Sequence, residues 1–285
     1  MPRSHINTSM CTALGVTIFF FGFGVSSLHG DKDLASLAQL GLGSVNPRTI
    51  ISWTIPSSGN DGLINNILVA NIAQPILSLV YFTYNGVFTC MLLGYEWSGY
   101  SIKRKGLRIS NIPEGAQRST YFLQLPYRYA LPLMGVSGVL HWLLSQSIFL
   151  VSIDRFDAFG ERVVLSRDYG TRESRGSQDY LTCGYSPIAI LAVMIIATFM
   201  IVFIFVMGLR RYKGTIPLAG SNSGAISAAC HLDEKHAGTD VVTLSLQWGV
   251  TSAMDADIRH CSFSPEEVEP PQEGVLYAGL EKKNN

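Results

Sequence analysis

The chain has 285 residues and a formal net charge of zero, and charged residues make up 15% of it, against about 25% in an ordinary soluble domain. The neutral balance gives no indication of nucleic acid or of a strongly charged partner. Five cysteines are too few and too scattered for a disulfide scaffold. The mean hydropathy of +0.24 and the clustering of apolar residues instead favour a protein of the lipid bilayer.

Four apolar stretches are predicted to be transmembrane helices, because a helix needs about 20 mainly apolar residues to cross the hydrocarbon core. They span residues 11–28, 67–93, 130–151 and 187–209, and none of them contains Asp, Glu, Lys or Arg. The alternative is four buried helices of a soluble domain, but such helices show an amphipathic stripe and residues 187–209 show none. Residues 11–28 also fit a cleaved signal peptide. We therefore predict an all-α membrane protein with four transmembrane helices.

Polar side chains recur in the second stretch at spacings of three and four, which places them on one helical face. They are Asn71, Gln74, Ser78, Tyr81 and Asn85. The third stretch has a similar face, formed by Ser137, His141 and Ser145. Unpaired polar groups facing lipid cost several kcal/mol each, so we expect both faces to point inward. They either join neighbouring helices through hydrogen bonds or line a polar cavity that holds or passes a solute.

His141 is the only histidine in the four stretches, and a titratable residue at membrane depth indicates a functional site by default. Proton transfer would need a carboxylate at similar depth, and the stretches contain none. Burial disfavours the charged imidazole. We therefore predict a neutral His141 that faces Asn71, Gln74 or Ser78, with ligand contact and proton transfer as the alternatives.

The distribution of Lys and Arg predicts the orientation, because cytoplasmic loops carry an excess of both. A basic run follows the second stretch, and three more cations at residues 210, 211 and 213 follow the fourth. This pattern predicts cytoplasmic N- and C-termini in a plasma membrane or endomembrane. The basic run either serves only as a determinant of this orientation or also contacts anionic lipid headgroups. Its members are Lys103, Arg104, Lys105 and Arg108.

The segment after the fourth stretch is predicted to be a separate cytosolic tail. Residues 1–209 would form the helical bundle with its loops, and residues 210–285 a small tail that is either mixed or β-rich, or else partly disordered. Residues 244–250 alternate apolar and polar side chains, as a half-buried strand does. Two Cys–His pairs, at residues 230–231 and 260–261, match no common zinc-ligand spacing, so we predict no metal site.

Catalytic and cofactor-binding sequence motifs are absent, and we expect neither an enzyme nor a cofactor. The polar face without charge favours a non-enzymatic scaffold, sensor or receptor-like membrane protein. The alternative is a transporter or channel subunit in which the same polar residues line a solute path.

Several blocks of the sequence resemble a family of uncharacterised fungal polytopic membrane proteins, over about residues 42–279. The blocks include NPRTIISW, QRSTYFLQLPYRYALPLMGVSGVLHWLLSQSIFLV, PLAGSNSGAISAACH and EGVLYAG. The resemblance implies an integral membrane protein of ascomycete fungi. Members of that family carry a domain of unknown function at their N-terminus, and this chain resembles their C-terminal portion. The resemblance implies no activity and no substrate.

Overall fold

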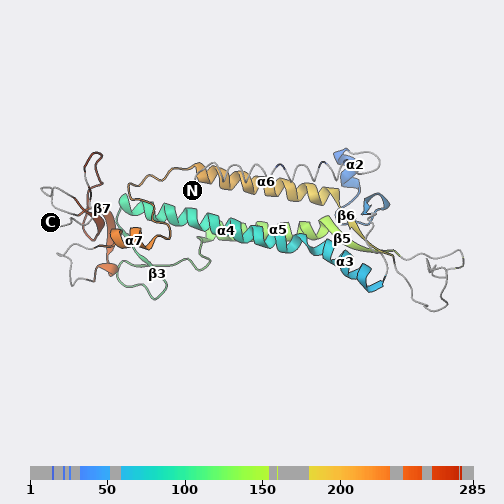
Figure 1. The fold of residues 1–285 in the computed structure, drawn as a ribbon, viewed down its shortest axis with the longest axis horizontal. Helices are drawn as coiled ribbons and strands as arrows, with labels where there is room; N and C mark the ends of the chain where they lie inside the picture. The colour runs from blue at the N-terminus through green and yellow to red at the C-terminus, as the bar shows by residue number, and fades with distance from the viewer. Residues whose placement is uncertain are drawn as a thin grey trace, which may run out of the picture. The chain divides into compact units, whose positions relative to one another are not determined.

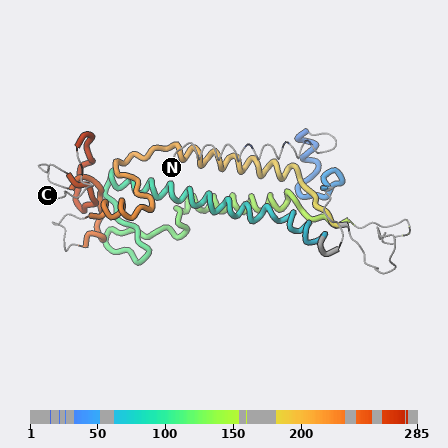
Figure 2. The backbone as a smooth tube through the Cα atoms, in the orientation of Figure 1, coloured from blue at the N-terminus to red at the C-terminus, as the bar shows by residue number. Residues whose placement is uncertain are grey.

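The structure is a computed structural model, drawn in Figure 1 and traced in colour in Figure 2. It describes residues 33–51, 59–153, 180–231, 240–251 and 259–275, together with the single residues Gly15, Gly22, Ser26, Phe159 and Tyr277. The chain divides into two compact units, and each takes two separate segments of the sequence. Unit 1 comprises Met1–Thr83 and Pro132–Phe205, and unit 2 comprises Tyr84–Leu131 and Val206–Asn285.

Two helices follow each other almost without interruption in the second apolar stretch. They are α3 (Gly59–Asn71) and α4 (Ala73–Ser98). Ile72 forms a turn between them, although its N–H still bonds the Leu68 carbonyl at 2.9 Å. The interruption lies beside Pro75, which has no N–H to donate to the preceding turn but is well tolerated in the first turn of a new helix. The polar face of the stretch is therefore divided between two helices.

Unit 1 contains a three-stranded antiparallel sheet with the order β1-β6-β5. Its strands are β1 (Ile50–Ile51), β5 (Ile148–Ile153) and β6 (Tyr180–Tyr185). β5 and β6 are in register from Ile148 opposite Tyr185 to Ile153 opposite Tyr180. Figure 1 shows α3 beside β5 and β6, and the helix contacts both strands.

The remaining elements of unit 1 attach to this sheet. The short helix α2 (Leu34–Gln39) contributes Leu37 to an apolar cluster with Leu40 and Tyr185, and η1 (Pro47–Thr49) leads into β1. Ser186 connects β6 to α6 (Pro187–Leu209), and its hydroxyl donates to the Gly41 carbonyl at 2.9 Å. The bounds of α6 agree with the predicted fourth stretch.

The prediction of an all-α protein with four transmembrane helices is wrong. The described residues form three small β-sheets. Among them, two helical segments are long and apolar enough to cross a membrane. One is Gly62–Ser101, which contains most of α3 and all of α4, and the other is Pro187–Leu209. In the predicted third stretch, α5 (Tyr127–Ser147) ends at Ser147 and the residues Ile148–Val151 belong to β5. This β-branched and aromatic run pairs with β6 instead of lengthening the helix. The first stretch lies outside the described residues, except for Gly15, Gly22 and Ser26, which are helical.

Unit 2 contains the end of α4, the start of α5 and a second antiparallel sheet with the order β2-β7-β8. The sheet strands are β2 (Lys105–Gly106), β7 (Ser245–Val250) and β8 (Cys261–Ser264). A parallel pair, β3 (Arg108–Ile109) and β4 (Arg118–Ser119), lies in the same unit. The helical segments are η2 (Gly99–Ser101), α7 (Ser223–Ala229) and η4 (Val241–Thr243).

The core of unit 2 combines segments that are far apart in the sequence. β7 confirms the strand predicted at residues 244–250, and its Leu246 and Trp248 point into the core as the alternation requires. The buried core residues are Tyr100, Ile216, Ala229, Val241, Leu246, Trp248 and Phe263. The sequence after α4 and the sequence after α6 thus share one hydrophobic core.

Candidate functional site

The predicted contact between the two polar faces is confirmed for one pair, Gln74 of α4 and His141 of α5, both in unit 1. Nε2 of Gln74 donates to the backbone carbonyl of His141 at 3.2 Å, and Oε1 of Gln74 lies 2.6 Å from Nδ1 of His141. The first bond requires the amide nitrogen, so the oxygen must face the imidazole. Because an amide oxygen only accepts, Nδ1 of His141 carries the proton. Both side chains are half-buried.

Three other predicted face residues bond to a carbonyl of their own helix. Ser78 donates to the Gln74 carbonyl at 3.2 Å, and Asn71 donates to the Ile67 carbonyl at 2.9 Å while remaining exposed. Ser145 is also exposed and donates to the Trp142 carbonyl at 2.7 Å.

Three predicted face residues complete the set. Tyr81 and Ser137 are half-buried in unit 1, whereas Asn85 belongs to unit 2, where its carbonyl accepts from Thr89 at 2.8 Å. In the described part of the chain, the predicted polar faces therefore meet through one residue pair, which forms two hydrogen bonds between α4 and α5. We call this contact the Gln74–His141 lock.

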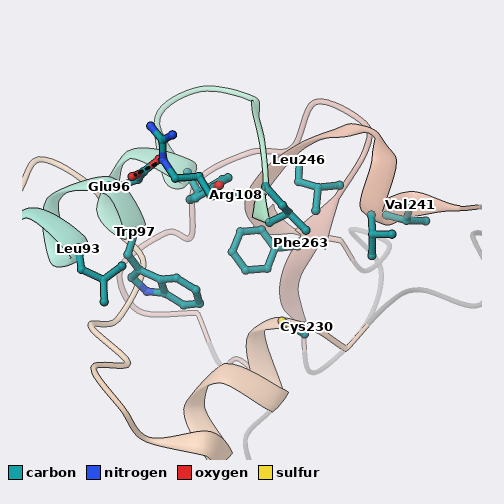
Figure 3. Close-up of a pocket in the computed structure, with 11 residues that line it drawn as sticks. Leu93, Glu96, Trp97, Arg108, Cys230, Val241, Leu246 and Phe263 are labelled. Carbon is teal, nitrogen blue, oxygen red and sulfur yellow. Dashed lines mark hydrogen bonds and ion pairs between the residues drawn. The ribbon is translucent and has the colours of Figure 1, made fainter. Parts of the chain in front are cut away.

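A pocket of about 310 Å³ lies in unit 2 and was not predicted from the sequence (Figure 3). Its walls come from the end of α4, from η2 and the chain after β2, from the end of α7, and from η4, β7 and β8. The lining residues are Leu93, Glu96, Trp97, Tyr100, Leu107, Arg108, Cys230, Val241, Val242, Leu246 and Phe263. Two of these carry a charge, Glu96 and Arg108, and the others make a largely apolar wall.

Aromatic contacts hold the pocket walls in place. The Phe263 ring meets the Trp97 ring edge to face at 5.5 Å between centroids and the Tyr100 ring in the same manner at 5.4 Å. The indole N–H of Trp97 donates to the Pro217 carbonyl at 3.0 Å, and the Tyr100 hydroxyl donates to the Gly106 carbonyl at 3.0 Å. Trp97 and Tyr100 therefore each have both an apolar contact and a satisfied polar group.

A charged cluster borders the pocket, with one carboxylate between two guanidinium groups. Nε of Arg108 donates to both oxygens of Glu96, at 2.8 and 2.9 Å, and Nη2 of Arg118 donates to Oε1 of the same carboxylate at 2.8 Å. Arg108 also bonds the Tyr121 hydroxyl at 2.6 Å, and its guanidinium lies 4.0 Å from the centre of that ring. The Glu96 side chain is 21% exposed, so water screens the cluster only partly.

Lys105 adds a third cation to this part of unit 2. Its Nζ lies 5.7 Å from the centre of the Tyr100 ring, and burial lowers the pKa of its ammonium below the ordinary 10.5, although the Glu96 carboxylate opposes that effect. With Arg108, Arg118 and Lys105 against Glu96, the edge of the pocket has an excess of positive charge. Of the other predicted headgroup contacts, Lys103 and Arg104 are exposed, and Arg104 donates to the Ser245 carbonyl at 3.3 Å.

Glu96 and the aromatic residues of the pocket were not predicted from the sequence as parts of a site. Glu96 carries a readable signal, since it is a lone acid between an apolar stretch that ends at residue 93 and a basic run that begins at residue 103. The contribution of Phe263 had no such signal, because it depends on the pairing of β8 with β7.

The Cys–His pairs of the tail partly converge. The rings of His231 and His260 meet edge to face with 5.4 Å between their centroids. Burial raises the pKa of the Cys230 and Cys261 thiols, which disfavours the thiolate that a metal would need. Within the described ranges, no group of three or more His, Cys, Asp or Glu is placed to hold a metal ion, and His236 lies outside them.

These features define a protein of two mixed α/β units in which the described residues include two helices long and apolar enough to cross a membrane. The chain belongs to the family defined by a domain of unknown function, DUF8419, which matches residues 6–273. The domain of unknown function thus covers most of this chain. Comparison with curated proteins and with solved structures finds no match to the chain.

Proposed function

We propose that the protein is an integral membrane protein with a non-enzymatic role as a scaffold, sensor or receptor. The observation that carries this proposal is the exposure of its apolar helices. In the most apolar windows of Gly62–Ser101 and of Pro187–Leu209, only 6% of the residues are buried. A core helix of a soluble protein would be mostly buried.

The exposed side chains are large. Leu79 and Phe82 of α4 are 67% and 69% exposed, and Phe199 of α6 is 70% exposed. Fully burying such a side chain stabilises a protein by about 1.5–3 kcal/mol. Contact with lipid provides that burial without any further protein, which favours the bilayer as the partner of these helices.

The cations that follow α6 support the proposed orientation. They lie at residues 210, 211 and 213, and the positive-inside rule assigns the tail that begins with them to the cytoplasm. Two crossings place both termini on the same side of the membrane. We propose cytoplasmic termini in the plasma membrane or an endomembrane, and a fungal source on the basis of the family resemblance.

The Gln74–His141 lock supports a structural role for the polar residues. The partner of the imidazole is an amide, which cannot exchange a proton with it near neutral pH. Interhelical hydrogen bonds of this kind contribute about 0.6–2 kcal/mol each in membranes. The lock fastens α4 to α5 and carries no chemistry in this proposal.

The alternative of a transporter or channel subunit draws on the exposed amide of Asn71 and the exposed hydroxyl of Ser145. It predicts that cysteines placed at residues 71, 74, 78, 81 and 85 all react with a water-soluble thiol reagent in intact membranes. The scaffold or sensor role predicts protection at residue 74, which lies in the lock.

Extraction of membranes tests the proposal. Membranes from cells that express the full chain are washed at alkaline pH, which strips peripheral proteins, and then dissolved in detergent. We expect the protein to stay in the pellet after the alkaline wash and to enter the supernatant only with detergent. Release by the alkaline wash alone would overturn the proposal.

A further inference from the structure

We propose that the pocket of unit 2 binds a long-chain fatty acid, with its acyl chain against the apolar wall and its carboxylate at the cationic edge. The proposal concerns unit 2 alone and does not depend on the Gln74–His141 lock. It assigns a ligand to a site that the scaffold or sensor role leaves without one.

The size of the pocket matches one acyl chain. A cavity of about 150 Å³ lined by aliphatic and aromatic residues holds a benzene molecule. The pocket of unit 2, at about 310 Å³, has about twice that volume and lies at the lower end of the range for small-molecule sites. A single flexible chain fits such a space, whereas the two chains of a phospholipid need more.

The wall chemistry favours an apolar chain. Figure 3 shows the side chains of Trp97, Phe263 and Leu246 facing the same space, with Cys230 at its border. Two wall residues have much of their apolar surface uncovered, since Leu93 is 62% exposed and Val242 is 52% exposed. Covering this surface with an acyl chain is favourable by about 25 cal/mol per Å².

The charge at the pocket edge selects an anionic head. Glu96 accounts for one negative charge, whereas Arg108, Arg118 and Lys105 contribute three positive charges around it and around Tyr100. The excess positive charge lies next to an apolar wall, which is the arrangement that a carboxylate on a hydrocarbon chain requires. A neutral chain of equal length lacks the ionic part of this interaction.

Photolabelling of the full-length protein in phosphatidylcholine nanodiscs tests the proposal. The probe is a palmitate that carries a photoreactive diazirine in its chain, and the labelled residues are identified by peptide mass spectrometry. We expect saturable labelling of wall residues that unlabelled palmitate abolishes. We also expect palmitate to slow the alkylation of Cys230, a native thiol at the wall.

Two variants distinguish the pocket from unspecific uptake into lipid. Val242→Phe fills the pocket from an exposed position, which limits the risk of misfolding, and it should reduce the competed labelling about tenfold. Leu244→Phe adds similar bulk at an exposed residue outside the pocket and should leave labelling unchanged. Equal labelling in both variants, or labelling confined to residues of α4 and α6 outside the pocket wall, would overturn the proposal.

Competitors test the head group. Palmitate should compete about tenfold better than hexadecanol, and Lys105→Gln should reduce that preference. Equal competition by hexadecanol would overturn the role of the cationic edge. Competition by a lysophospholipid as strong as that by palmitate would overturn the assignment to a free fatty acid. The alkaline wash tests membrane insertion, whereas these competitors test the ligand of the pocket. A negative result in one measurement is therefore distinguishable from a negative result in the other.

Discussion

Replacing Gln74 with Leu removes both bonds of the Gln74–His141 lock while keeping a side chain of similar size. The variant leaves the proton on Nδ1 of His141 and the carbonyl of that residue without their partner. An unsatisfied, half-buried polar group costs about 1–3 kcal/mol. His141→Leu should cost a similar amount, because it leaves Oε1 of Gln74 without its donor.

The double variant distinguishes the lock from two independent losses. When both side chains become apolar, the Nδ1–Oε1 bond is lost without leaving either of its two groups unsatisfied, so Gln74→Leu/His141→Leu should cost less than the sum of the single changes. His141→Leu keeps the backbone carbonyl that accepts from Gln74, so the cycle reports the Nδ1–Oε1 bond alone, and the membrane value for one bond predicts a coupling energy of about 0.6–2 kcal/mol.

The assay is reversible unfolding in mixed detergent micelles of the unchanged protein, the two single variants and the double variant. Loss of helix is followed by circular dichroism. Thr83→Val is the control, because the Thr83 hydroxyl is exposed and donates to the Leu79 carbonyl of its own helix, and the free energy of unfolding should change by less than about 0.5 kcal/mol. Additive single changes, with a coupling below about 0.3 kcal/mol, would refute the lock.

Three further predictions concern the two units. Glu96→Gln removes the carboxylate between two guanidinium groups and should lower the free energy of unfolding by about 1–3 kcal/mol in denaturant titration, and an unchanged stability would contradict the role of the cluster. Alkylation of Cys230 should reach half its maximal rate above pH 9.0, the ordinary pKa of a thiol, because burial raises the pKa of this one; a midpoint below pH 9.0, by peptide mass spectrometry, would show that burial does not control it. Gly214→Ala should destabilise unit 2 by about 1–3 kcal/mol, because a Cβ there would overlap the Ser98 carbonyl. The same change at Gly135 meets no neighbour within 4 Å and should be neutral or slightly stabilising, so equal effects in thermal unfolding would argue against the overlap.

The bounds of a helix were predictable where an apolar stretch is helical throughout. They were not predictable where one apolar stretch passes from a helix into a strand. α6 has the predicted bounds, since nothing in residues 187–209 interrupts the pattern. Residues 148–151 are equally apolar, yet they form β5, because a short apolar run fits a buried strand as well as a helix. The strand β6 that decides between them is about 30 residues away in the sequence, outside any local pattern.

The two candidate sites, the Gln74–His141 lock and the pocket of unit 2, also differ in how far the sequence predicts them. The Gln74–His141 contact was predictable, because helical periodicity alone places each residue on the polar face of its helix. The exposure of Asn71 and Ser145 was not, because it depends on where each helix ends. The pocket of unit 2 was beyond sequence reasoning, since it joins Trp97 to Phe263 through the sheet β2-β7-β8.

Water accessibility of α4 and α6 in open membrane fragments tests the central claim most directly. Single cysteines replace Leu79 and Phe199, which are exposed on the two apolar helices, and Ile112, which is 81% exposed in the chain between β3 and β4. A membrane-impermeant maleimide should label residue 112 at once and residues 79 and 199 only after detergent is added. Labelling of all three at the same rate without detergent would show that no bilayer covers these helices.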